Sequence, residues 1–296
     1  MKNGVIIINK EDGMSSARVV GAVKRLLSLD KAGHTGTLDP MATGVLPILV
    51  NRGVKASEFM LTSDKHYIAT LKLGITTDTE DITGTILTES SALPTADEVK
   101  KCAEGFVGKY MQTPPMYSAL KRGGKKLCDL ARQGVTVERE AREVEIISLT
   151  CTPKDRPDEY TLDVKCSKGT YIRTLCADIG SSLGCGGCMA TLCRAEASGF
   201  TLADAHTLSE IEALSPAERE ALIVPVEEIF KDAERITLPD FFSRLAHSGL
   251  EIYLKKIGAT LPLGARVTLF DKDGFFALGE VRKFEDGLAI KPIRQF

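Results

Sequence analysis

The chain has 296 residues, a formal net charge of −2 at pH 7, 43% hydrophobic residues and 26% charged residues, which is the composition of a globular protein with one large domain or a large and a small one. No apolar run reaches the roughly 18 residues that a membrane-spanning helix needs, and the run near the N-terminus is too short for a secretory signal. Eight cysteines lie between Cys102 and Cys193 without the small secreted context that favours disulfides. We therefore expect a reduced, cytoplasmic protein with no membrane segment.

The first third of the chain predicts mixed strands and helices. Short apolar runs or alternation of buried positions predict strands at 4–9, 48–50 and 65–74. In the third of these, the residues expected on one face are Tyr67, Ala69, Leu71 and Leu73. Ser15 or Ser16 can cap a helix that runs to about Leu29.

The middle of the chain continues the α and β pattern. Thr95-x-x-Glu98 has the spacing of a capping box and predicts a helix from about 95 to 106. Residues 143–151 and 159–167 predict paired strands around the turn PKDRPDE. A helix from about 171 to 183 is expected to end at Gly184, a residue type that favours helix C-termini.

The C-terminal part changes character. Residues 204–234 hold nine acidic and two basic residues, a net −7, in a helical pattern. Residues 264–296 carry strand-like runs (ARVTLF, FFALGEVRKF, LAIKPI) separated by DKDG and EDG turns. This change predicts a small β-rich domain appended to the larger one.

One polar stretch, AGHTGTLDPMATGVLP at 32–47, stands out for chemistry. Its glycines at 33, 36 and 44 allow the backbone to turn tightly and to approach a ligand closely. Pro40 favours an extended conformation at Asp39, so its carboxylate is expected on a loop. Such an Asp can be a nucleophile, a general base or a metal ligand, or it can cap the next element through an Asx turn. The residues alone leave these roles open.

A second stretch, KRGGKKLCDLAR at 121–132, is locally basic. It holds five basic residues and one acid, so its net charge is +4 on a nearly neutral chain. A basic face of this kind can bind phosphates, or it can be an ordinary solvated surface.

The spacing Cys185-x-x-Cys188-x4-Cys193, with Cys176 nearby, invites a zinc interpretation. Only three sulfurs are closely spaced, and the second short pair of a zinc ribbon is absent. We therefore expect no metal.

Four ordered motifs and one insertion, taken together, resemble those of the TruB family of tRNA pseudouridine synthases. GHTGTLDPMATGVL at 33–46 is similar to the family's signature, and QTPPMYSALKRGGKKLCDLARQG at 112–134 resembles its RNA-gripping insertion. The other matching elements are Gly4 with Asn9-Lys10 and Gly13-Met14-Ser15-Ser16, Lys65-His66-Tyr67, and CSKGTYIRTL at 166–175. Three positions depart from the family's usual residues: Glu11, Cys128 and Ala195.

The resemblance implies a site. Asp39 would be the catalytic carboxylate, Arg173 would pair with it and keep it ionised, and Tyr67 would stack on the flipped uracil. The residues that would contact or support the RNA are His34, Lys65, Leu192, Lys121, Arg122, Lys125, Lys126 and Arg132. Such a site fits the chemistry, because a base must leave its stack before its glycosidic bond can be reached, and an aromatic ring recovers part of that cost.

The resemblance also implies a fold and a substrate. The fold would be α+β, with a mixed, largely antiparallel central sheet flanked by helices. Residues 1–235 would form the catalytic domain, with the RNA-gripping insertion at about 112–142, and 236–296 a PUA-like RNA-binding domain. The expected activity is isomerisation of uridine 55 in the T loop of tRNA, without a cofactor, by a monomer that needs no protein partner. Two alternatives stay open: a guide-RNA-dependent pseudouridine synthase, and an RNA-binding or tRNA-folding module without catalysis.

Overall fold

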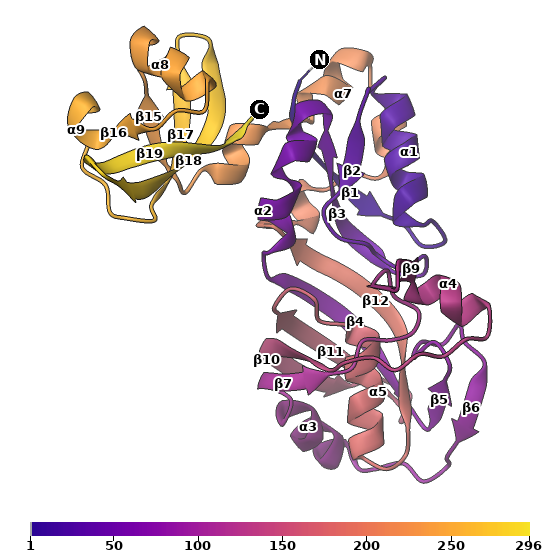
Figure 1. Cartoon of the computed structure of the whole chain (residues 1–296). Helices are drawn as coiled ribbons and strands as arrows, with labels where there is room; N and C mark the ends of the chain where they lie inside the picture. Colours follow the sequence, from indigo (N-terminus) through magenta and orange to yellow (C-terminus); the bar gives the residue numbers. More distant parts are fainter. Residues whose placement is uncertain (1) are drawn as a thin grey trace.

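The computed structural model describes residues 2–296, and its larger part is built on one ten-stranded sheet (Figure 1). The strand order is β14-β1-β3-β12-β4-β11-β10-β7, with β2 paired to β3 and β13 paired to β12. Only the β12–β3 pair is parallel among the named pairs of this sheet, so the expected mixed, largely antiparallel sheet is confirmed. The strands are β1 (Gly4–Lys10), β2 (Ala32–His34), β3 (Thr43–Val50), β4 (Lys65–Leu73), β7 (Gly108–Gln112), β10 (Arg142–Pro153), β11 (Glu159–Cys166), β12 (Gly187–Ala197), β13 (Phe200–Thr201) and β14 (Val224–Pro225).

Helices flank this sheet, with α5 packed on β12 and α3 packed on β10. They are α1 (Ser16–Leu26), α2 (Ser57–Leu61), α3 (Ala96–Glu104), α4 (Leu127–Arg132), α5 (Ile172–Ser182), α6 (Leu208–Ala213) and α7 (Pro216–Ala221), with the 3-10 turns η1 (Asn51–Ala56), η2 (Leu202–Asp204) and η3 (Val226–Phe230). The capping box between Thr95 and Glu98 at the start of α3 is confirmed. None of the helices between residues 2 and 296 combines the length and the apolarity needed to cross a bilayer.

The predicted elements are present, with one informative difference in length. β3 begins at Thr43 rather than at Ile48 and runs through Pro47. A proline lacks an amide donor and argues against a central strand. Here Pro47 lies just past the last β2–β3 pair, His34 with Ile48, and its carbonyl accepts the amide of Thr35 at 3.2 Å, so the donor that it lacks falls at the end of that ladder.

Two small hairpins project from the main sheet. The first joins β5 (Ile75–Thr77) to β6 (Ile86–Glu89), and the second joins β8 (Lys121–Arg122) to β9 (Lys125–Lys126). Neither hairpin was predicted from the sequence, because each strand is only two to four residues long.

The C-terminal part forms a separate five-stranded sheet with its own apolar core. Its strand order is β15 (Glu234–Thr237), β17 (Arg266–Asp271), β18 (Gly274–Phe284), β19 (Gly287–Gln295) and β16 (Ile252–Tyr253). The three predicted runs in 264–296 correspond to β17, β18 and β19. The helices α8 (Asp240–His247) and α9 (Leu254–Ile257) were not predicted.

Aromatic rings join the two sheets. The ring of Phe230 lies 5.3 Å from that of Phe59 and 5.8 Å from that of Phe296, and Phe296 lies 5.4 Å from Phe275. Arg294 of β19 also forms an ion pair of 2.5 Å with Glu58 of α2. The C-terminal sheet is therefore packed against the η1–α2 segment of the larger part.

Candidate active site

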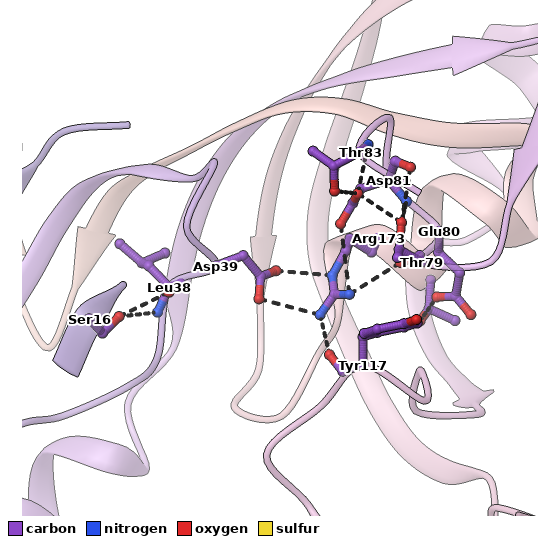
Figure 2. Close-up of polar contacts among 10 residues, drawn as sticks. Ser16, Leu38, Asp39, Thr79, Glu80, Asp81, Thr83, Tyr117 and Arg173 are labelled. Carbon is purple, nitrogen blue, oxygen red and sulfur yellow. Dashed lines mark hydrogen bonds and ion pairs between the residues drawn. The ribbon is translucent and has the colours of Figure 1, made fainter. Parts of the chain in front are cut away.

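Asp39 lies on the loop between β2 and β3, as the following proline predicted. Ser16, the first residue of α1, fixes the preceding residue of this loop: its hydroxyl donates to the Leu38 carbonyl and accepts the Leu38 amide, both at 2.9 Å (Figure 2). The α1 N-terminus thus determines where Asp39 leaves the sheet.

A buried lysine holds the other side of the same loop. Lys10 is 1% exposed, and its ammonium donates to the carbonyls of Pro40 at 2.9 Å and Ala42 at 2.5 Å. A third bond of 2.9 Å goes to the carbonyl of Glu11. Burial lowers the pKa of Lys10, and the nearby carboxylates of Asp12 and Asp39 oppose that shift. The Lys10 ammonium therefore fixes the loop by binding the carbonyls of the loop backbone, not the Asp39 carboxylate.

The glycines of this loop act differently from the sequence expectation. Gly44 has a φ of +100°, and a Cβ there would lie 2.3 Å from the Arg194 carbonyl of β12. Its close approach is therefore to the neighbouring strand, not to a ligand. Gly33 has no atom within 4 Å of the position a Cβ would take, so close approach does not require a glycine there.

The carboxylate of Asp39 meets the guanidinium of Arg173, which projects from the first turn of α5 (Figure 2). Nε of Arg173 lies 3.0 Å from Oδ2 of Asp39, and Nη2 lies 3.4 Å from Oδ1. This two-pronged geometry needs the planar guanidinium. The Asp39 side chain is 33% exposed while that of Arg173 is 6% exposed, so the carboxylate is the member of the pair that an incoming ligand can reach.

The remaining donors of Arg173 are held by two other segments. Nη2 donates to the Tyr117 carbonyl at 2.7 Å, and Nη1 donates to the Thr79 carbonyl at 3.1 Å. Oδ2 of the buried Asp81 lies 3.9 Å from Nη1. Oδ1 of Asp81 is itself fixed by the hydroxyls of Thr79 at 2.8 Å and Thr83 at 2.6 Å. The guanidinium is thus braced on the side that faces away from Asp39.

Burial raises the pKa of the Asp39 carboxyl above its ordinary value, and the Arg173 guanidinium is the largest influence in the opposite direction. The carboxylate of Asp81 adds to the rise, and the Lys10 ammonium opposes it. Arg173 thus counteracts the cost of placing a charged carboxylate in a confined site.

Asp39 and Arg173 line a cavity of about 350 Å³. Three other residues expected at the site, Tyr67, Lys65 and Leu192, lie in the same wall. The structure therefore brings together five side chains from a loop, two strands and a helix. The further lining residues are Thr35, Gly36, Thr37, Leu38, Leu61, Tyr117, Ser118, Ala119, Ser167, Gly169, Thr170, Tyr171, Ile172 and Arg194.

Tyr67 on β4 lies beside a buried arginine. Arg194 is 2% exposed and donates from Nε to the Val45 carbonyl at 2.7 Å and from Nη2 to the Gly36 carbonyl at 3.1 Å. Burial raises the pKa of the Tyr67 hydroxyl, and Arg194 opposes the rise. Tyr67 is thus a neutral phenol at neutral pH, with its ring lining the cavity.

The charged end of Lys65 binds backbone carbonyls, and His34 lies outside the cavity wall within residues 2–296. The Lys65 ammonium donates to the carbonyls of Leu61, at 3.1 Å, and Ser63, so it supports the start of β4 from within the wall. His34 lies on β2, and its Nδ1 accepts the amide of Gly36 at 3.4 Å. Burial lowers the pKa of His34, which makes the ring neutral at neutral pH. His34 lies beside the cavity and is not among the residues that form its wall within 2–296.

The five basic residues expected to contact RNA lie on one projecting unit. Lys121 pairs with Lys126 and Arg122 with Lys125 across the β8–β9 hairpin, and Arg132 ends α4. All four residues of the two hairpin strands are exposed, and the Arg132 side chain is 72% exposed. The segment 117–119, which enters this hairpin, lines the cavity. The basic unit is thus attached directly to the cavity wall.

The cysteines remain free thiols in the structure, and Cys185 and Cys188 are buried. Across residues 2–296, no group of three or more His, Cys, Asp or Glu side chains is arranged to hold a metal ion.

Sequence reasoning assigned no role at the site to three residues that shape it: Asp81, Lys10 and Arg194. The run TTDTEDITG at 76–84, dense in Thr and Asp, indicates a turn but not its contact with Arg173, which lies more than ninety residues later in the chain. Lys10 and Arg194 are charged residues that are almost wholly buried, and local sequence patterns do not predict the burial of a charged residue.

The overall architecture matches solved structures across nearly the whole chain. The crystal structure of a Cbf5-Nop10-Gar1 complex contains a chain that is 24% identical, with a TM-score of 0.72, over 99% of this chain and 84% of that one. The structure of an H/ACA RNP bound to a substrate RNA containing 2'-deoxyuridine gives 22% identity and a TM-score of 0.71, with the same coverage. These similarities define the class of fold, which is an α+β fold with a large mixed sheet and a smaller β-rich sheet at the C-terminus.

Sequence comparison identifies the family. A model described as TruB family pseudouridylate synthase (N terminal domain) matches residues 24–172, and one described as tRNA pseudouridylate synthase B C-terminal domain matches 173–231. The tRNA pseudouridine synthase B of Alkaliphilus oremlandii is 42% identical over 282 residues, which is 95% of this chain and 93% of that protein. The protein of the same name from Francisella tularensis subsp. novicida is 42% identical over 284 residues, covering 95% and 92%. The chain belongs to the TruB family of pseudouridylate synthases.

Proposed function

We propose that this protein is a tRNA pseudouridine synthase that converts the uridine at position 55 of the T loop to pseudouridine. The observation that carries the proposal is the Asp39–Arg173 pair in a cavity that also exposes the ring of Tyr67, in a chain of this family. The reaction breaks the bond between N1 of uracil and C1′ of the ribose, rotates the base and rejoins it through C5, which loses its hydrogen as a proton while N1 takes up a proton. Product and substrate are isomers, so the chemistry needs no redox partner.

Asp39 is the reactive group in this proposal. Its carboxylate is the accessible end of the pair, and a carboxylate can act on the glycosidic bond as a nucleophile only while it is ionised. Arg173 favours that ionised form and directs both carboxylate oxygens through its two contacts of 3.0 and 3.4 Å. Its buried position and its braces on Thr79 and Tyr117 keep this direction fixed during the reaction.

Tyr67 receives the flipped base. A uridine in the T loop must leave its stack before Asp39 can reach it, at a cost of a few kcal/mol. Stacking on an aromatic ring returns about 1–3 kcal/mol per base. Leu192, 8% exposed and in the same cavity wall, adds an apolar contact beside the base.

The basic unit formed by the β8–β9 hairpin and α4 binds the RNA backbone. Its lysines and arginines are exposed and follow the cavity-wall segment 117–119 in the chain, so they can neutralise phosphates that flank the target. His34, next to the cavity, contacts the RNA loop as a neutral ring.

The chain divides into a catalytic domain and a smaller RNA-binding domain. Pairing of β15 with β17 supports a boundary just before Glu234, slightly earlier than the residue 236 expected from the sequence. We propose that the C-terminal sheet contacts a more distant part of the tRNA, and that the enzyme works as a cytoplasmic monomer.

Purified protein and an unmodified tRNA transcript, without guide RNA, cofactor or other protein, test the proposal. Pseudouridine should form at position 55, and a transcript with cytidine at that position should give none. A guide-dependent enzyme would fail on the bare transcript, and a pure RNA-binding module would bind it without turnover.

Asp39→Asn keeps the size of the side chain and removes its charge. Turnover should be lost while the Kd for tRNA stays within about tenfold of wild type. Asp97→Asn, at an exposed carboxylate in the first turn of α3, is the matched control and should be as active as wild type. Near-normal turnover by Asp39→Asn would exclude Asp39 as the reactive carboxylate.

A further inference from the structure

The turn between β5 and β6 contacts α5 through three consecutive residues. The Thr79 carbonyl accepts a hydrogen bond of 3.1 Å from Nη1 of Arg173, and Oδ2 of Asp81 lies 3.9 Å from the same nitrogen. Between them, Glu80 accepts a hydrogen bond of 2.6 Å on Oε2 from the Thr174 hydroxyl. Figure 2 shows these three residues on the side of Arg173 that faces away from Asp39.

Glu80 has an unusual backbone for its residue type. Its φ is +62°, in the left-handed region that non-glycine residues seldom adopt. Its amide donates to the Thr77 carbonyl at 3.3 Å, and its carbonyl accepts the Met189 amide of β12 at 3.0 Å. These backbone bonds turn the Glu80 side chain toward α5 and would persist if that side chain were changed.

The Glu80–Thr174 bond is separate from the cavity. Thr174 directly follows Arg173 and is 4% exposed. Within the part of the chain that the structure describes, the cavity wall includes Arg173 but neither Glu80 nor Thr174. An effect of Glu80 on the reaction must therefore pass through the position of the turn and of Arg173.

The geometry explains why this link matters. Two of the groups that brace Arg173, the Thr79 carbonyl and the Asp81 carboxylate, belong to the turn that Glu80 ties to α5. The backbone attaches that turn to β12 through Met189, which lies on a different element from Arg173. If the side-chain link is removed, the turn can shift relative to α5 and carry both braces with it.

We propose that Glu80 is a positioning residue for the isomerisation: its hydrogen bond to Thr174 holds the Thr79–Asp81 turn against α5 and so keeps Arg173 aimed at Asp39. This inference rests on the proposed function. The acceptor oxygen is what the role requires, not the negative charge, so glutamine can replace glutamate while a shorter side chain cannot.

The test compares Glu80→Asn with Glu80→Gln. Asparagine tolerates a positive φ and stays polar, but it is one methylene too short to reach Thr174, whereas glutamine keeps the reach and the acceptor. A small displacement of a catalytic group can cost up to about 100-fold in rate, so we expect Glu80→Asn to slow single-turnover pseudouridine formation by roughly 10- to 100-fold. Glu80→Gln should stay within about threefold of wild type, and the Kd for tRNA should change by less than about threefold in both variants.

Thr174 supplies the matching half of the test. Thr174→Val should slow the reaction like Glu80→Asn, while Thr174→Ser, which keeps the hydroxyl, should not. The double variant Glu80→Asn with Thr174→Val should be no slower than Glu80→Asn alone, because both changes break one bond. Thr88→Val is the control within the same hairpin, since it removes the exposed 2.6 Å bond to Thr76 without touching α5, and its rate should equal that of wild type.

Three results would overturn the inference: a wild-type rate for Glu80→Asn, equal losses for Glu80→Gln and Glu80→Asn, or additive losses in the double variant. Thermal denaturation identifies a variant that does not fold, and the Thr174 pair then decides the question. An inactive wild-type protein would instead refute the proposed function, before any variant is compared.

Discussion

Replacing Arg173 by lysine gives the most direct test of the pairing at the site. The change keeps one positive charge beside Asp39 but removes the planar fork. Arg173 spans Asp39 with two nitrogens, at 3.0 and 3.4 Å, and uses its remaining donors on Tyr117 at 2.7 Å and Thr79 at 3.1 Å. A lysine ammonium is a single point and cannot reach both carboxylate oxygens and both carbonyls.

The size of the effect follows from these contacts. We assume that lysine keeps one bond to Asp39 and one to a carbonyl, so that two charge-assisted bonds are lost. The 3.4 Å bond is long, so each lost bond is counted at about 1–1.5 kcal/mol, at or just below the lower limit of roughly 1.5 kcal/mol for bonds to charged groups. The sum of about 2–3 kcal/mol in transition-state stabilisation corresponds to a rate loss of roughly 30- to 150-fold.

Single-turnover pseudouridine formation with saturating enzyme measures this loss, and filter binding measures the Kd for tRNA. The Kd should stay within about threefold of wild type, because the Arg173 side chain is 6% exposed and makes no contact that a bound RNA backbone would need. A rate within about threefold of wild type would refute the claim that the two-pronged geometry matters. A large loss of affinity would place Arg173 in RNA binding instead.

Three further predictions follow from the charges. Lys125→Ala with Lys126→Ala should weaken tRNA binding and reduce the salt dependence of its Kd by up to about two units of slope, and an unchanged slope would return this hairpin to the solvated surface. Because burial raises the pKa of Asp39 above its ordinary value of 3.8, the single-turnover rate should begin to fall at a pH above 3.8 as the solution is made more acidic. A rate that does not change with pH until the protein unfolds would contradict this. Burial, with a contribution from Glu80, raises the pKa of Asp178 from its ordinary value of 3.8 to about 6. The protonated carboxyl therefore contributes fully to stability below pH 3.8, and this contribution is lost as the pH rises through about 6. Asp178→Asn should therefore raise the free energy of unfolding at pH 7.5 by about 1–2 kcal/mol, after allowance for partial solvent screening, with a smaller gain at pH 5, and urea unfolding at both pH values measures it.

Local signals in the sequence were sufficient for the regular elements. The capping box at Thr95 and Glu98, the alternation in β4 and the turns that separate β17, β18 and β19 depend on residues close together in the chain. Such patterns specify where a segment begins, which face it buries and where it ends. The family motifs added Asp39, Tyr67 and Arg173 as candidates, and the structure places all three in one cavity wall.

The contacts that hold the site depend on pairs that are far apart in the chain. Arg173 meets the Thr79 carbonyl across 94 positions and the Asp39 carboxylate across 134, and Arg194 reaches Gly36 across 158. No local pattern encodes such pairs, because their interaction energy arises only when the order of strands in the sheet brings β12, α5 and the turn between β5 and β6 together.

The sequence by itself therefore determined the α+β pattern, the family and the candidate residues of the site, because each depends on short motifs. Only the tertiary structure decided which carbonyls and carboxylates hold Arg173, and that Lys10 and Arg194 are buried supports of the Asp39 loop. The physical reason is that a buried charge is stable only when other segments supply its partners, and those partners are chosen by the packing of the whole chain.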